Sequence, residues 1–458
     1  MASTKRVVIV GGDAAGMSAA SQATRANPGL DVAAYEKGAF VSYGACGIPY
    51  YIAGEIPSWE DLVVMTPERF AERGVDVRVR HEVVELRLAT REVTVRDGVS
   101  GRTFRDRYDY LVLATGGAPV SPPVDGTELD GVVALRNLED GIALRECLDG
   151  QAPRHAVIVG TGLIGLEMAE AFAKRGIEVT LVGRSDRLLG FDPDLIRPVV
   201  EDLEGKGVRL FLETQVEAIE GTAGRAQAVT TSEGRMPADL VLLAVGLRPS
   251  TELARRAGVP VGRSGAIATT DRMRTEAPGV FAVGDCAEVT HVVSGEKVHA
   301  PLALSANRTG RVAGDNLAHE ARGSASTQRF RGTARTMVTK VFDHTVAQTG
   351  LDLDGVRAGG FDAQAFTREG RSRAGYYPGS ESLWTRIVAD RRTRRLLGAQ
   401  MVWKEGVSGR IDVFATALFG RMTVDDVYNL DLAYAPPFGP VYDPVIEICG
   451  RAALELAR

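Results

Sequence analysis

A single cysteine, Cys46, stands in the segment 41–51, which reads VSYGACGIPYY. Tyr51 lies five residues later, where a second thiol could have closed an internal disulfide. A lone thiol in redox chemistry has to pass through a mixed disulfide with a small thiol, a persulfide or a sulfenic acid. An isolated cysteine is more often an inert buried residue than a nucleophile. A redox role for Cys46 therefore has to be supported by the segments around it in the sequence.

Composition and charge predict a soluble cytoplasmic protein of two or three domains. The chain of 458 residues exceeds what one core normally supports, and its net charge of −5, without a basic run, argues against nucleic acid as a partner. The expected strand at residues 5–10 leaves no room for a signal peptide, and no apolar run approaches the ~20 residues of a membrane span. The histidines show no ligand spacing, so no metal site is predicted. The cysteines lie far apart, as is usual in a reducing cytosol: Cys46, Cys147, Cys286 and Cys449.

Residues 7–36 follow the strand, turn, helix and strand order of a dinucleotide-binding fold. The turn at 11–16 reads GGDAAG, and Glu36 ends the second strand. The first glycine permits the tight turn and the last lets helix and strand pack closely. The helix N-terminus can hold a pyrophosphate, and the acid can bond a ribose hydroxyl. Asp13 replaces the middle glycine of this fingerprint, but the surrounding order still predicts a dinucleotide site.

A second copy of the pattern lies at 155–185, where the turn at 160–165 reads GTGLIG and keeps all three glycines. Its second strand is followed by Gly183, Arg184 and Ser185 in place of an acid. An acid there would bond a ribose 2′-hydroxyl and repel a 2′-phosphate, whereas a guanidinium and a hydroxyl suit the phosphate. The sequence therefore favours NADPH over NADH, with a solvated surface arginine as the alternative.

Other segments complete this plan. Apolar strands at 108–116 and 238–246 end in small residues and are expected to carry the chain from one nucleotide domain to the next. A strand within 275–285 delivers Asp285 to a turn, and a helix is expected at about 302–317. In a flavin fold the acid reaches the ribityl chain, and the helix N-terminus stabilises the anionic pyrimidine edge of a reduced flavin.

The composition changes beyond about residue 330, where no glycine fingerprint occurs. Strand-like segments at 336–342, 383–389 and 398–403 precede an amphipathic helix near 411–420. A sheet-and-helix module of this kind usually serves as a subunit interface or a lid.

Together these motifs resemble the pyridine nucleotide-disulfide oxidoreductases over essentially the whole chain. The pattern Ser42-x3-Cys46-Gly47-x-Pro49-Tyr50 is similar to the single-cysteine branch of that superfamily. The two-cysteine members carry C-x4-C at this place. The single-cysteine branch holds coenzyme A-disulfide reductases, NADH oxidases, NADH peroxidases and NAD(P)H-dependent persulfide reductases.

The resemblance implies an α/β fold with two nested Rossmann-like dinucleotide-binding domains and a C-terminal α+β dimerisation domain. It places FAD in a discontinuous domain at 1–118 and 246–328 and NAD(P) at 119–245. Residues 329–458 would form the dimerisation domain of a homodimer.

Three positions distinguish among the members of the branch. Peroxidases and oxidases carry a histidine in the first glycine-rich turn, where this chain has Ala14. Tyr376 and Tyr434 stand in the sequences YYPG and YAPPF, which resemble coenzyme A-disulfide reductase motifs. The resemblance makes these two tyrosines a catalytic pair with Cys46, supplied by the partner subunit. Two departures from the branch, Ala45 in place of asparagine and Tyr442 in place of lysine, concern coenzyme A recognition.

The remaining site residues follow from the same resemblance. Positions that match contacts to coenzyme A are Ser18, Gln22, Arg25, Ser42, Asn307 and Arg308. Positions that match contacts to FAD or NAD(P) are Gly11, Gly12, Ala15, Gly16, Glu36, Lys37, Thr115, Gly116, Gly160, Gly162, Ile164, Gly165, Glu167, Arg184, Ser185, Gly246, Gly284, Asp285, Pro301, Leu302 and Ala303.

The sequence thus predicts an FAD-dependent enzyme that uses NADPH, or NADH, to reduce coenzyme A disulfide or a related small disulfide through Cys46. Reduction of coenzyme A persulfide or polysulfide and NAD(P)H oxidase activity stay open at the same cysteine. A non-catalytic flavoprotein that binds a protein partner in a redox-dependent way is the alternative from another class, although it would not need a thiol beside the flavin.

Overall fold

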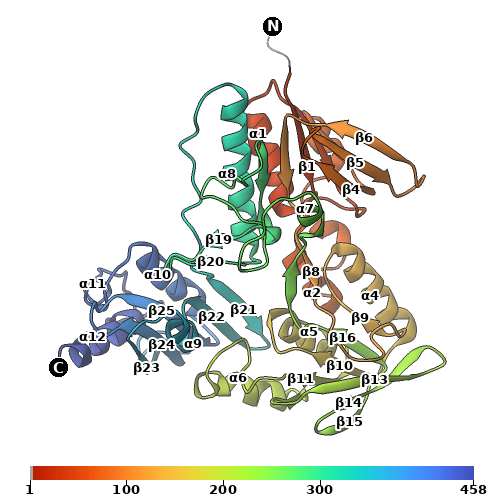
Figure 1. The fold of residues 1–458 in the computed structure, drawn as a ribbon. Helices are drawn as coiled ribbons and strands as arrows, with labels where there is room; N and C mark the ends of the chain where they lie inside the picture. Colours follow the sequence, from red (N-terminus) through yellow and green to blue (C-terminus); the bar gives the residue numbers. More distant parts are fainter. Residues whose placement is uncertain (1–3) are drawn as a thin grey trace.

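The structure is a computed structural model, and it describes residues 4–458. Three five-stranded sheets with their helices make up most of the molecule, and the C-terminal sheet lies to one side of the other two (Figure 1). This is the predicted α/β architecture, although the exact domain boundaries stay a prediction.

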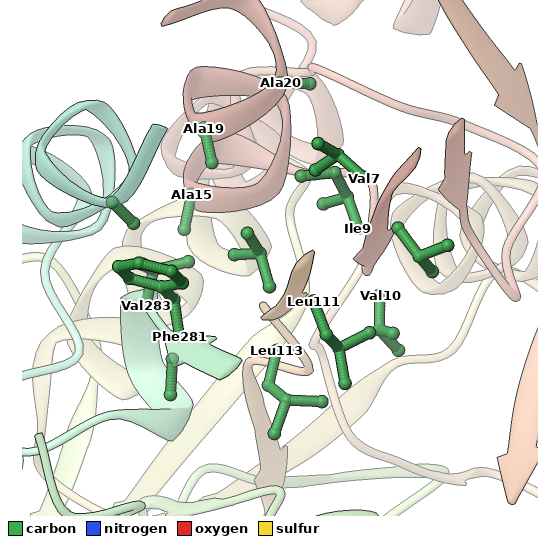
Figure 2. Close-up of a cluster of buried hydrophobic side chains, with 14 of the residues drawn as sticks. Val7, Ile9, Val10, Ala15, Ala19, Ala20, Leu111, Leu113, Phe281 and Val283 are labelled. Atoms are coloured by element: carbon green, nitrogen blue, oxygen red, sulfur yellow. The ribbon is translucent and has the colours of Figure 1, made fainter. Parts of the chain in front are cut away.

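The first sheet is parallel and joins segments from distant parts of the chain in the order β18-β7-β1-β2-β3. Its strands are apolar runs because both faces of a parallel sheet are covered. Figure 2 shows Val7 and Ile9 from β1, Leu111 from β7 and Phe281 from β18 around Ala15, all of them buried. The strands are β1 (Arg6–Val10), β2 (Asp31–Tyr35), β3 (Val75–Arg78), β7 (Tyr110–Leu113) and β18 (Val280–Ala282).

Two helices, α1 (Ala14–Ala26) and α8 (Ala303–Ala321), lie side by side against this sheet (Figure 1). Their backbones touch through glycines. A Cβ on Gly310 would lie 2.2 Å from the Ala15 carbonyl oxygen, and one on Gly314 would lie 2.3 Å from that of Ala19. The helix predicted at about 302–317 is therefore present but continues for about one more turn at its C-terminal end.

Smaller elements surround the first sheet. An antiparallel sheet contains β4 (His81–Arg87), β5 (Glu92–Asp97) and β6 (Thr103–Arg107). The connecting helices are α2 (Ile48–Ala53), α3 (Pro67–Ala71) and α7 (Glu252–Arg256), and a short ribbon pairs β19 (Val289–Thr290) with β20 (Lys297–Val298).

The second sheet repeats the parallel plan in the order β12-β11-β10-β16-β9. The chain enters through β8 (Gly117–Pro119) and leaves through β17 (Leu247–Pro249), and these two strands pair with each other. The other strands are β9 (Val132–Val133), β10 (His155–Val159), β11 (Glu178–Val182), β12 (Arg209–Phe211) and β16 (Leu240–Leu243), with an antiparallel sheet of β13 (Val216–Thr222), β14 (Arg225–Thr231) and β15 (Gly234–Pro237). The helices are α4 (Leu138–Gln151), α5 (Leu163–Lys174) and α6 (Pro193–Gly205).

The third sheet is antiparallel, in the order β21-β22-β25-β24-β23, and its helices form a separate buried cluster with it. The predicted strands at 336–342, 383–389 and 398–403 correspond to β21, β24 and β25, and the helix near 411–420 corresponds to α10. The strands are β21 (Met337–Val341), β22 (His344–Gly350), β23 (Ala363–Arg371), β24 (Ser382–Asp390) and β25 (Leu396–Trp403); the helices are α9 (Leu353–Ala358), α10 (Val407–Phe419), α11 (Val424–Tyr428) and α12 (Pro444–Leu456). Among residues 4–458, no helix has the length and apolar character that a membrane crossing requires.

Candidate active site

The first glycine-rich turn joins β1 to α1 and is closed by backbone contacts that exclude side chains. Gly11 has φ +109°, and a Cβ on it would lie 2.2 Å from the Ala114 carbonyl oxygen. A Cβ on Gly16 would lie 1.9 Å from the Gly11 carbonyl oxygen. The Gly12 amide donates to the Glu36 carboxylate at 2.7 Å, so the acid at the end of β2 is held beside the turn.

The second turn, between β10 and α5, has the same construction. Gly160 has φ +120°, and Cβ atoms on Gly160 and Gly165 would lie 2.2 and 2.0 Å from the carbonyl oxygens of Ala244 and Gly160. A Cβ built on Gly162, the N-cap of α5, would have no atom within 4 Å of it. Open space in front of a helix N-terminus fits a pyrophosphate, because the first amide groups of a helix have no partner within it. Both turns therefore suit dinucleotide cofactors.

Cys46 lies in a short 3-10 helix (Ala45–Gly47) just before α2. It is the exposed cysteine of the chain, whereas Cys147 is half-buried and Cys286 and Cys449 are buried. The pKa of the Cys46 thiol is raised, first by the partial loss of hydration around the sulfur and then by the negative charge of Glu167.

The acids that act on Cys46 come from three separate places in the chain. Glu167 lies in α5, Asp13 in the first turn and Asp285 in the turn after β18. Glu167 and Asp285 were predicted to contact cofactors, and the fold brings both near the thiol. Asp13 joins them although its side chain was expected only as a departure from the fingerprint.

Arg136 is a residue of this site that sequence reasoning missed. Its guanidinium donates to Asp285 at 3.1 Å and to the Gly117 carbonyl at 2.7 Å. It immediately precedes the N-cap of α4, Asn137, which forms a capping box with Asp140. The capping box fixes the start of the helix and so the direction of Arg136, but no sequence motif links it to a turn 149 residues away.

Five of the six residues predicted to contact coenzyme A lie on α1 and α8. The Ser18 hydroxyl donates to the Asn307 side chain at 2.7 Å, and Gln22 donates to Asp315 at 3.0 Å. Arg25 is exposed and donates to the Gln22 side chain at 3.1 Å, and Arg308 is also exposed. Ser42 precedes the short helix that carries Cys46, and its amide donates to the carbonyl of Gly12 at 3.0 Å.

Tyr376 and Tyr434 meet on the surface of the C-terminal sheet domain. Their hydroxyl oxygens are 3.1 Å apart, and the side chains are 76% and 45% exposed. Tyr376 lies between β23 and β24 and Tyr434 between α11 and α12. The hydrogen bond to Tyr376 raises the pKa of Tyr434, so Tyr434 holds its proton at neutral pH.

Arg184 and Ser185 follow β11, as predicted, and both are exposed. The Ser185 hydroxyl donates to the neighbouring Asp186 at 3.2 Å and accepts from the Arg187 amide at 3.1 Å. Within residues 4–458, no group of three or more His, Cys, Asp or Glu side chains could hold a metal ion.

Comparison with known proteins agrees with this geometry. Residues 5–310 match the family Pyridine nucleotide-disulphide oxidoreductase, and residues 336–444 match its dimerisation domain. The CoA-dependent NAD(P)H sulfur oxidoreductase of Pyrococcus abyssi is 41% identical over 96% of this chain and 97% of its own length. Coenzyme A disulfide reductase of Staphylococcus aureus is 30% identical over 98% of this chain and 99% of its own.

A solved structure shows the same fold over almost the whole chain. Reduced CoADR-RHD of Bacillus anthracis is 33% identical, has a TM-score of 0.95, and is matched over 99% of this chain and 81% of that one. On these matches and on its two glycine-rich folds, the chain belongs to the pyridine nucleotide-disulphide oxidoreductase family.

Proposed function

We propose that the protein is an FAD-dependent NADPH oxidoreductase that reduces coenzyme A disulfide, or a related small disulfide, through Cys46. The observation that carries this proposal is that Cys46, the exposed cysteine, lies within the charge influence of Asp13 in the first glycine-rich turn and of Glu167 in the helix that follows the second. The names of the relatives in Pyrococcus abyssi and Staphylococcus aureus, which refer to coenzyme A, support the choice of substrate.

The two glycine-rich turns support particular residues as the cofactor contacts. Gly11, Gly12, Gly16 and Glu36 suit FAD at the first turn, and Gly160, Gly162 and Gly165 suit NADPH at the second. Arg184 and Ser185 would contact the 2′-phosphate of NADPH. Bound FAD would carry two electrons from NADPH to the sulfur at Cys46.

In the proposed reaction the Cys46 thiolate attacks one sulfur of coenzyme A disulfide. The substrate S–S bond breaks, a Cys46–S–S–CoA bond forms, and one coenzyme A thiolate leaves. Tyr434, supplied by the partner subunit, donates its phenol proton to that thiolate, while Tyr376 holds the phenol by their hydrogen bond. Two-electron reduction would then break the Cys46–S–S–CoA bond, which returns the Cys46 thiolate and releases the second coenzyme A as a thiolate. A proton from solvent would restore the Tyr434 phenol.

The test is Cys46→Ser, with Cys147→Ser as the matched control. Cys46→Ser should keep FAD and its reduction by NADPH but lose turnover with coenzyme A disulfide. Turnover above about a tenth of the wild-type rate would contradict the assignment. Cys147→Ser should stay near the wild-type rate.

Coenzyme A persulfide is a second candidate substrate, because the relative from Pyrococcus abyssi is named a sulfur oxidoreductase. The Cys46 thiolate would attack the inner, coenzyme A-bound sulfur of the persulfide, which breaks its S–S bond, releases hydrosulfide and forms the same Cys46–S–S–CoA disulfide. Comparing kcat/KM for coenzyme A disulfide, coenzyme A persulfide and oxygen would separate the three activities.

A further inference from the structure

Asp13 occupies a position where the second nucleotide fold has open space. It is the N-cap of α1 with extended backbone (φ −97°, ψ −159°), and Gly162 is the N-cap of α5 with nearly the same backbone (φ −85°, ψ −172°). The two turns are therefore equivalent at these positions. In the second fold a Cβ on Gly162 would have no atom within 4 Å. At the equivalent position of the first fold stands the carboxyl group of Asp13.

The Asp13 carboxyl has few hydrogen bonds or positive charges to replace the water it loses on burial. Its Oδ1 atom is buried and has no hydrogen-bond partner among the described residues. The side chain makes no capping hydrogen bond to the first turn of α1. The nearby backbone amides of Ala14 and Tyr43 and the charge of Arg136 only partly offset its burial. Arg136, however, also donates to Asp285 and to the carbonyl of Gly117, so its single positive charge is shared.

Negative charge already surrounds the turn. Glu36 faces Asp13 from the end of β2, Asp285 shares Arg136, and Glu139 acts on the neighbouring Tyr43 from the start of α4. Burial is the largest cause that raises the pKa of Asp13, and the charge of Glu36 raises it further. The net result is a pKa of about 6, against the ordinary 3.8 of this group.

A pyrophosphate at the N-terminus of α1 would bring two further negative charges to the same place. An ionised Asp13 would repel it and would compete with it for the Ala14 amide and for Arg136. A neutral carboxyl removes the repulsion and gains an O–H that can donate to a phosphate oxygen.

We propose that binding of FAD to this chain takes up one proton, and that Asp13 is the group that receives it. Asp13 is thus a positioning residue that makes FAD affinity depend on pH. This inference rests on the proposed function in one respect, that FAD is the dinucleotide of the first fold.

The sign of the effect follows from linkage. Below the pKa of Asp13 in the free protein the carboxyl is already neutral, and the Kd for FAD should not change with pH. Above it, each unbound chain must gain a proton to bind, so Kd should rise by about tenfold per pH unit. The rise ends when the pH passes the still higher pKa of Asp13 in the complex.

The experiment measures FAD affinity of the full-length protein without substrate. Release of FAD from diluted holoenzyme and rebinding to the FAD-depleted chain are followed by flavin fluorescence. Between about pH 6.5 and about pH 8.5, Kd should rise by up to about a hundredfold for the wild type and by about threefold or less for Asp13→Asn. Calorimetry in buffers of different ionisation enthalpy should give uptake of close to one proton per FAD for the wild type and close to zero for the variant.

Two further variants keep the proposal falsifiable. Asp13→Gly recreates the glycine of the second fold and should bind FAD without pH dependence even if Asp13→Asn folds poorly. Glu139→Gln removes a neighbouring carboxylate and should keep the proton uptake. FAD binding without proton uptake in the wild type, or uptake that survives in Asp13→Gly, overturns the inference alone. Absence of FAD binding at every pH would instead overturn the proposed function.

Discussion

The tyrosine pair allows a prediction that separates proton donation from packing. Tyr434→Phe removes a hydroxyl from a side chain that is 45% exposed, so folding stability should change by no more than about 0.5 kcal/mol. If Tyr434 protonates the leaving thiolate, turnover with coenzyme A disulfide should nevertheless fall about 10²-fold or more, the usual contribution of a general acid.

Tyr376→Phe should have a smaller effect, because it removes only the hydrogen bond to Tyr434 at 3.1 Å. Such a bond contributes about 0.5–1.5 kcal/mol, equivalent to about 2- to 13-fold in rate. The same bond raises the pKa of Tyr434, so its loss should lower that pKa. The alkaline limb of the turnover profile should then move to lower pH in Tyr376→Phe.

Stopped-flow measurement of the two half-reactions is the assay. Both variants should keep the wild-type rate of reduction by NADPH and lose rate only with coenzyme A disulfide. Tyr428→Phe, an exposed tyrosine of α11 outside the pair, is the matched control and should match the wild type. Slowing of the NADPH step alone by Tyr434→Phe, or equal losses in both tyrosine variants, would refute the assigned roles.

Three other changes test different parts of the structure. Arg184→Ala should raise KM for NADPH and leave that for NADH nearly unchanged, since the exposed guanidinium would contact only the 2′-phosphate; equal effects would refute this. Glu167→Gln removes a negative charge that raises the pKa of Cys46, so alkylation of the thiol by iodoacetamide should begin at lower pH than in the wild type; an unchanged profile would contradict that effect. Glu170→Gln removes the charge of a buried carboxylate that accepts from Lys174, Lys340 and the Phe342 amide. It should lower the free energy of unfolding, measured by urea titration, by about 2 kcal/mol. Glu178→Gln, at an exposed site, is the control and should change that free energy by less than about 0.5 kcal/mol.

The two nucleotide folds could be predicted because glycine is required at particular points of their turns. Gly11 and Gly160 have positive φ angles and backbone neighbours where a Cβ would lie, and such constraints leave a visible pattern in the sequence. Strands of a parallel sheet are likewise recognisable as apolar runs between turns. The order of the antiparallel C-terminal sheet left no comparable pattern, because β25 is placed between β22 and β24 by packing of distant segments.

The full set of residues in the site was less predictable, because it also brings together segments that are distant in the sequence. Arg136 reaches Asp285 across the two nucleotide folds, and the sequence near Arg136 shows only the start of a helix. The tyrosine pair was expected from family motifs, and the structure places their hydroxyls in contact. Asp13 was recognised as a departure from the fingerprint, but its burial and its unpartnered oxygen depend on residues from three other segments.

The charges around Cys46 bear on how readily its thiol reacts. Loss of hydration and the carboxylates of Glu167 and Asp285 disfavour the thiolate relative to states in which the sulfur is uncharged. A mixed disulfide with coenzyme A and a sulfenic acid are both uncharged states of the sulfur, and both form by attack of the thiolate. The charges therefore lower the fraction of reactive thiolate at neutral pH for either reaction, so the choice between a disulfide and oxygen depends on what binds beside Cys46 rather than on the pKa of the thiol.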